Sequence, residues 1–79
     1  MKPLVLYSTD HCTLCDEVLD LLLSMPELSG WSLTVIDIAT DAALIEQYGD
    51  RLPVIRVDDA EFEAPFAREH LAKWLGDVE

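Results

Sequence analysis

Several features that would mark an exported or membrane protein are missing from the sequence. No run approaches the roughly 18 apolar residues that a helix needs to cross a bilayer. Residues 1–7 carry one cation and an apolar stretch too short for a signal peptide, with no small-residue cleavage site. We therefore expect a cytoplasmic protein. No repeat, low-complexity segment or linker interrupts the 79 residues, which predicts one domain over residues 1–79.

Positive charge is also scarce. Five basic residues stand against sixteen acidic ones, which gives a formal net charge of −11. The cations are scattered along the chain: Lys2, Arg51, Arg56, Arg68 and Lys73. Such a charge repels nucleic-acid phosphates and anionic headgroups, so we expect no nucleic acid and no membrane as partner. The acidity favours solubility or a basic or neutral partner, and we expect a monomer.

Cysteine occurs at two positions only, Cys12 and Cys15. Two cysteines cannot form the disulfide framework of a small secreted protein, and cytoplasmic thiols are kept reduced. A pair three positions apart in such a protein indicates redox or metal chemistry more often than a structural crosslink. The 51% hydrophobic content, divided into runs by turn residues, argues for a compact globule rather than a disordered chain.

The order of apolar patterns predicts the fold. A short apolar strand precedes a helix whose stripe begins at Leu14 and runs through Val18 to Met25, and a β-branched strand follows. A strand, a helix and a strand form a βαβ unit with parallel strands. The expected elements are strand 2–7, helix 13–25, strand 31–38, a short helix capped by Thr40 or Asp41 and ended by a left-handed Gly49, strand 53–57, a turn at Asp58-Asp59, strand 60–63 and a helix ended by Gly76. This βαβ-αββα order predicts an α/β protein with a four-stranded mixed sheet and helices on both faces, the minimal thioredoxin fold.

The two cysteines fall at the predicted junction between the first strand and the first helix. A thiolate at a helix amino terminus is stabilised by unpaired backbone N–H groups and by the helix dipole, which fits Cys12 as a nucleophile. Cys15 lies one turn later on the same side, where it could attack a mixed disulfide on Cys12 and release the substrate. This pattern predicts thiol-disulfide exchange.

Three other interpretations of the pair stay open. The cysteines could be two buried thiols, since cysteine is among the most buried residue types. They could hold zinc or a cluster with His11 and His70, although a second closely spaced ligand pair is missing. The chain could also be a non-catalytic adaptor or carrier that docks a partner through the same fold.

The residues around Cys12 have opposing effects on its thiolate. His11 would stabilise the anion when protonated, or it is only a solvated loop residue. The carboxylates of Asp10, Asp16 and Glu17 disfavour a second negative charge beside them. The sequence does not decide which influence is stronger.

Two stretches together carry a resemblance. Residues 7–15 (YSTDHCTLC) and residues 48–55 (YGDRLPVI) look like the glutaredoxin family of the thioredoxin fold, especially its small bacterial glutaredoxin-like branch. The resemblance implies that Cys12 is the nucleophile and Cys15 the resolving thiol. It also implies that Pro53 follows a cis peptide bond beside the cysteines and that the backbone of Leu52 pairs with the bound thiol substrate.

The expected glutathione site is incomplete. Glutaredoxins usually have a basic residue before the motif, a tyrosine within it and a glycine pair after the hairpin. Here those places hold residues 10–11 (DH), 13–14 (TL) and 63–66 (EAPF). Arg51 or Arg56 could supply one contact to a substrate carboxylate, or both are solvated charges. We expect no tightly bound cofactor, a protein or small-molecule disulfide as substrate, and glutathione or a reductase as electron donor.

Overall fold

The computed structural model describes residues 2–63 and 67–78. It contains four strands, three α-helices and two short 3-10 turns: β1 (Pro3–Ser8), α1 (Thr13–Ser24), η1 (Pro26–Leu28), β2 (Ser32–Asp37), η2 (Ile38–Thr40), α2 (Ala42–Tyr48), β3 (Val54–Val57), β4 (Ala60–Phe62) and α3 (Arg68–Val78). The predicted order of elements is confirmed. Within the described residues, no helix has both the length and the apolar character needed to cross a membrane.

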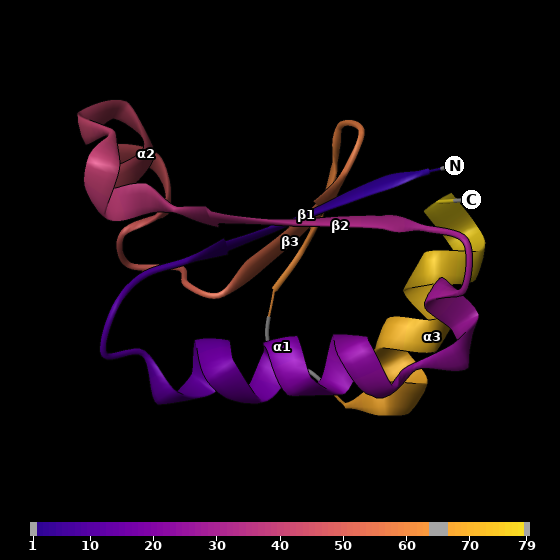
Figure 1. Cartoon of the computed structure of the whole chain (residues 1–79). Helices are drawn as coiled ribbons and strands as arrows, with labels where there is room; N and C mark the ends of the chain where they lie inside the picture. The colour runs from indigo at the N-terminus through magenta and orange to yellow at the C-terminus, as the bar shows by residue number, and fades with distance from the viewer. Residues whose placement is uncertain (1, 64–66, 79) are drawn as a thin grey trace.

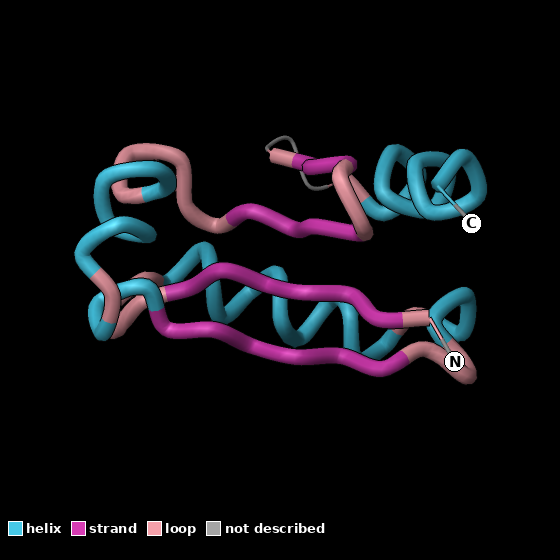
Figure 2. Tube along the Cα trace, turned by 90° about the horizontal axis from the view of Figure 1, so that it is seen from above, coloured by secondary structure: helices cyan, strands magenta, loops and turns pink. Residues whose placement is uncertain are grey.

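The four strands form one mixed sheet in the order β2-β1-β3-β4. Strand β1 pairs with β2 in parallel, from Pro3 opposite Ser32 to Ser8 opposite Asp37. Strand β3 runs antiparallel to β1, and β4 runs antiparallel to β3 through the hairpin. Figure 2 shows the strands side by side in this order. The sheet is therefore the predicted four-stranded mixed sheet.

Helices cover both faces of the sheet, as the sequence predicts. In Figure 1, α1 and α3 lie below the sheet and α2 lies above it at one end. Alternate residues of β1 point to opposite faces, as the pleat of a strand requires. Leu4 and Leu6 belong to the cluster beneath the sheet, whereas Val5 and Tyr7 belong to the cluster on the α2 side.

The lower face carries the larger apolar core, which we call the lower core. Nine residues from the sheet, from α1 with its C-cap and from α3 are almost fully buried there: Leu4, Leu6, Val18, Leu22, Met25, Ile55, Val57, Leu71 and Leu75. Burying a Leu- or Ile-sized side chain stabilises the fold by about 1.5–3 kcal/mol. The lower core therefore supplies most of the apolar burial that fixes α1, and with it the cysteine pair, against the sheet.

The α2 side carries a smaller cluster, which we call the upper core. Its buried members are Tyr7, Ile38, Tyr48 and Val54, and Leu52 packs against them. The rings of Tyr7 and Tyr48 stack with centroids 4.3 Å apart. Asp41 caps α2 by accepting from the N–H of Ala43 at 2.9 Å, as predicted. This cluster fixes the segment that leads into β3.

Three local expectations are wrong. Gly49 follows α2 with φ −53°, a right-handed conformation, so it is not a left-handed terminator. A side chain there would instead meet the carbonyl oxygen of Ile45 at 2.5 Å. Gly76 does not end the last helix, because α3 continues to Val78. Leu14 lies in the first turn of α1 with 43% of its surface exposed, so the buried stripe begins later, at Cys15 and Val18.

Candidate functional site

The loop after β1 places the first cysteine. The chain leaves the sheet at Ser8 and passes through His11, whose φ of 59° is left-handed. That conformation is uncommon for residues other than glycine, although Asn, Asp and His adopt it more often than most, and it redirects the backbone into the helix. Cys12 follows as the N-cap of α1, with an extended backbone at φ −108° and ψ 97°. Cys12 therefore lies at the helix amino terminus, as the sequence predicts.

The Sγ of Cys12 fulfils the role that a Ser or Asp oxygen has in other helix caps. It accepts the backbone N–H of Cys15 at 3.1 Å. One of the unpaired N–H groups of the first turn thus points at the sulfur, and the helix dipole adds partial positive charge there. Both effects favour the thiolate over the thiol when the sulfur is reduced.

The two cysteines are joined by a disulfide, and their Cα atoms are 5.2 Å apart. This separation lies within the range in which a disulfide forms without moving the backbone. The sulfurs differ in access, because Cys15 has 1% of its surface exposed whereas Cys12 is only half-buried. Only Cys12 is open to a large substrate.

Leu52 and Pro53, the residues expected beside the cysteines, lie at the same end of the sheet as the cysteine pair. Tyr7 pairs with Val54, so the next residues, Ser8 and Pro53, lie at one end of the β1-β3 strand pair. The Leu52–Pro53 peptide bond is cis, the isomer that the resemblance implies. Pro53 is buried, and Leu52 is half-buried against the upper core. In Figure 1 the segment before β3 and the loop before α1 both lie at the left end.

The other residues considered as partners of the cysteines are exposed to solvent. Asp10 and His11 are exposed in the loop, and His70 is exposed on α3. Across residues 2–63 and 67–78, no three His, Cys, Asp or Glu side chains gather as a metal site would require. The zinc interpretation therefore finds no preformed ligand set in this part of the chain. Of the 63–66 stretch, only Glu63 falls within the described residues.

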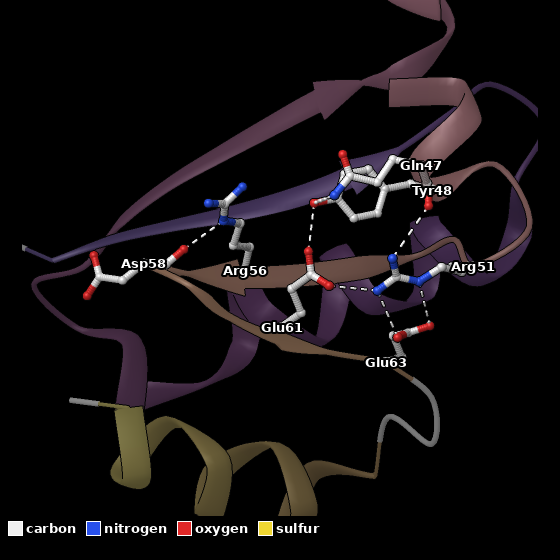
Figure 3. Close-up of polar contacts among 7 residues, drawn as sticks. All are labelled: Gln47, Tyr48, Arg51, Arg56, Asp58, Glu61 and Glu63. Carbon is white, nitrogen blue, oxygen red and sulfur yellow. Dashed lines mark hydrogen bonds and ion pairs between the residues drawn. The ribbon is translucent and has the colours of Figure 1, made fainter. Parts of the chain in front are cut away.

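Arg51, next to Leu52, is engaged rather than solvated (Figure 3). Its Nη2 donates to Glu61 Oε1 at 2.6 Å and to Glu63 Oε2 at 3.0 Å. Its Nε donates to Glu63 Oε1 at 3.2 Å, and its Nη1 donates to the backbone carbonyl of Gln47 at 3.4 Å. The guanidinium also lies 5.1 Å from the centre of the Tyr48 ring. Arg51 thus connects the end of α2 to the hairpin.

Tyr48 extends this network into the upper core. Its hydroxyl donates to Glu61 Oε2 at 2.6 Å and accepts from Gln47 Nε2 at 3.3 Å. Burial, together with the hydrogen bond to Glu61, raises the pKa of Tyr48 to about 12. The same hydrogen bond, with that from Arg51, lowers the pKa of Glu61 below its ordinary value. The contacts to Glu63 and Glu61 raise the pKa of Arg51, which stays charged.

Sequence reasoning missed Tyr48, Glu61 and Glu63 as members of this network. A signal was present in the hairpin, since alternate residues of a strand share a face. Glu61 lies directly opposite Arg56 in the β3-β4 register, on the face of the sheet that α2 covers. The pattern could predict carboxylates on that face, but not which arginine they would bind.

The structure has an apolar cavity that is separate from the cysteine site. An apolar cavity of about 260 Å³ lies at the other end of α1, away from the cysteines. Its lining residues are Leu4, Leu22, Leu23, Met25, Leu28, Ser29, Trp31 and Leu33.

Comparisons with known proteins agree with this fold. Residues 3–76 match the family described as Glutaredoxin-like domain (DUF836). The X-ray structure of a structural-genomics target protein, XcR50 from X. campestris, is 34% identical with a TM-score of 0.82, covering 96% of this chain and 99% of that one. The solution structure of XcR50 gives 34% identity and a TM-score of 0.81, covering 100% and 97%.

A more distant likeness concerns the fold alone. Thioredoxin 1 from the thermophilic eubacterium Thermosipho africanus is 15% identical with a TM-score of 0.72, covering 95% of this chain and 91% of that one. A comparison with curated proteins gave no match. The structural likeness therefore shows the fold, and the chemistry of the site has to be argued from the residues of this chain.

Proposed function

The chain belongs to the glutaredoxin-like domain family of thioredoxin-fold proteins, and on that premise we propose that it is a thiol-disulfide oxidoreductase. Cys12 is the attacking residue and Cys15 the resolving one. The observation that carries this proposal is the different setting of the two sulfurs. Cys12 caps α1 and accepts an N–H at 3.1 Å, whereas Cys15 is buried behind it.

The reaction transfers two electrons from the reduced pair to a substrate disulfide. The Cys12 thiolate attacks one substrate sulfur, forms a mixed disulfide and releases the other sulfur as a thiolate that takes up a proton. Cys15 then loses its proton and attacks the Cys12 sulfur. The Cys12–Cys15 disulfide forms, the second substrate thiol leaves, and the protein is oxidised while the substrate is reduced.

The segment before β3 supplies the surface on which the substrate rests. Leu52 is half-buried at the end of the sheet that carries the cysteines. An extended thiol substrate could pair with it while its sulfur meets Cys12. Electrons return to the disulfide from glutathione or from a reductase in a reducing compartment such as the cytoplasm.

Trapping separates the two cysteine roles. Reduced Cys15→Ser protein, exposed to bis(2-hydroxyethyl) disulfide, is expected to stop at a mixed disulfide on Cys12 that intact-mass measurement detects. Cys12→Ser protein is the matched control and is expected to remain unmodified in the same time, because Cys15 is buried. The wild-type protein is expected to pass through to the internal disulfide and release both thiols.

Three other outcomes would contradict the proposal or part of it. A stable adduct on Cys15 in the Cys12→Ser protein, with none on Cys12 in the Cys15→Ser protein, would reverse the assignment. Wild-type protein that reacts with no disulfide would remove the oxidoreductase proposal. Partner binding that survives the loss of both thiols would then favour the adaptor.

A further inference from the structure

The site has one cation at the cysteine end of the sheet, and that cation is already bound. Among the described residues, the other four cations lie farther along the sheet or on α3. Lys2 donates to the carbonyl of Val78, Arg56 donates to the carbonyl of Asp58, Arg68 lies 3.7 Å from Glu27 and Lys73 is on α3. Arg51 alone stands directly before Leu52 and Pro53.

Two carboxylates hold Arg51 in place. Glu63 receives two parallel hydrogen bonds from the guanidinium, from Nε at 3.2 Å and from Nη2 at 3.0 Å. Glu61 receives a third from Nη2 at 2.6 Å. A bidentate contact of this kind is the one that a substrate carboxylate would otherwise make, because the guanidinium fork matches carboxylate geometry.

The charges around Cys12 also fail to cancel. Arg51 and Arg56, which lies opposite Glu61, balance the carboxylates of Glu61 and Glu63. Exposed Asp10 and Asp16, on either side of Cys12, have no such balance. An anionic substrate thus meets carboxylates beside Cys12, while Arg51 is already bound. A cationic substrate is attracted, with a strength that falls as salt screens the charges.

We propose that Glu61 and Glu63 determine the substrate class of the site: by occupying Arg51 they make it select cationic and neutral disulfides over anionic ones. The inference rests on the proposed function, since it concerns the substrate of the Cys12–Cys15 pair. Arg51 is here a specificity-determining residue whose effect is cancelled by its neighbours, and it touches no reacting atom.

The test compares three disulfides of different charge, and each rate is divided by the rate of a small free thiol with the same disulfide, because the leaving thiols differ in reactivity. Reduced protein is mixed with bis(2-aminoethyl) disulfide, a dication, with neutral bis(2-hydroxyethyl) disulfide, and with anionic oxidised glutathione, and the loss of protein thiols is timed. After this division, the wild-type protein is expected to react fastest with the dication and slowest with glutathione disulfide. Glu63→Gln is expected to raise the anion-to-cation rate ratio by about 3- to 10-fold, in keeping with the modest energies of exposed ion pairs.

Glu27, in the 3-10 turn η1, provides a matched control. Glu27→Gln also removes one carboxylate from an arginine pair, since Glu27 lies 3.7 Å from Arg68, and the two glutamates have similar exposure at 38% and 44%. It changes the net charge equally but lies away from Leu52, so its rate ratio is expected to stay within about 2-fold of the wild type. Glu61→Gln is a second variant that should shift the ratio in the same direction as Glu63→Gln.

Arg51→Gln combined with Glu63→Gln completes the design. If the freed guanidinium causes the shift, the double variant should lose most of the gain shown by Glu63→Gln alone. An equal ratio change in Glu63→Gln and Glu27→Gln, or none in either, would overturn the inference while neutral disulfide still reacted. Failure of the neutral disulfide to react with wild-type protein would instead remove the proposed function itself.

Discussion

The two faces of the sheet are stabilised in different ways. The lower core buries nine apolar residues. Its side chains are held by hydrophobic contacts, which are non-directional. The upper core buries four residues, two of them tyrosines, and its rim is held by hydrogen bonds among Tyr48, Glu61 and Arg51. The face with directional contacts carries the residues before Pro53, so that segment depends on the smaller core, whereas the cysteine pair depends on the larger one.

The largest expected effect comes from opening the lower core. Leu22→Ala removes a side chain that is 2% exposed, and such truncations cost about 2–5 kcal/mol because a cavity remains. Leu23→Ala, its neighbour in α1, is the matched control, since that side chain is 70% exposed. Chemical denaturation should show a loss for Leu23→Ala within about 0.5 kcal/mol. Equal losses would mean that burial does not separate the two positions.

A smaller effect is expected from the upper core. Tyr48→Phe keeps the ring stacked on Tyr7 but removes the hydroxyl that donates to Glu61. A hydrogen bond to a charged group contributes about 1.5–3 kcal/mol, and part of this is retained because Glu61 still binds Arg51. We expect a loss of about 1–2 kcal/mol in denaturation. In a double-mutant cycle, a coupling of zero between Tyr48→Phe and Glu61→Gln would show that the contact adds nothing.

The smallest effect should be a change in the response to acid. Tyr48 and Arg51 lower the pKa of Glu61 from its ordinary 4.5, so the folded protein holds this carboxylate charged more readily than the unfolded chain does. The stability that results is present above pH 4.5 and is lost as the pH falls through the lower, folded value.

Denaturation between pH 7 and pH 3 measures this linkage. Glu61→Gln is expected to be less stable than wild type at pH 7 and to lose less stability below about pH 4.5, so the two curves approach each other. Leu22→Ala should lower the whole curve and leave its shape unchanged, because no titrating group is altered. Parallel curves for Glu61→Gln and wild type would contradict the role given to this carboxylate.

The lower core was predictable because it follows from local spacing. Apolar residues at three- and four-residue intervals specify one side of α1, and the alternation of short strands specifies their faces. The helix ends were predicted less well. Gly49 does end α2, but in a right-handed conformation, and Gly76 lies inside α3. A glycine permits a left-handed end but does not impose one, since packing against the sheet decides how far a helix continues.

The cysteine pair was visible for the same reason, since its chemistry depends on residues three positions apart. The polar network was not, because its partners are separated by 10 to 13 positions, as with Arg51 and Glu61 or Tyr48 and Glu61. Which of two arginines a carboxylate binds depends on how the hairpin lies against α2. That arrangement exists only after the two cores have formed.

Lys2 has a consequence for how the protein can be handled. Its Nζ donates to the carbonyl of Val78 at 2.6 Å, so residues near both ends of the described chain lie together, and in Figure 1 they are at the end of the sheet opposite the loop before α1. A tether attached at either position would hold the protein with its cysteines facing outward. A surface-immobilised form would therefore present the disulfide to solution whichever end carried the linker.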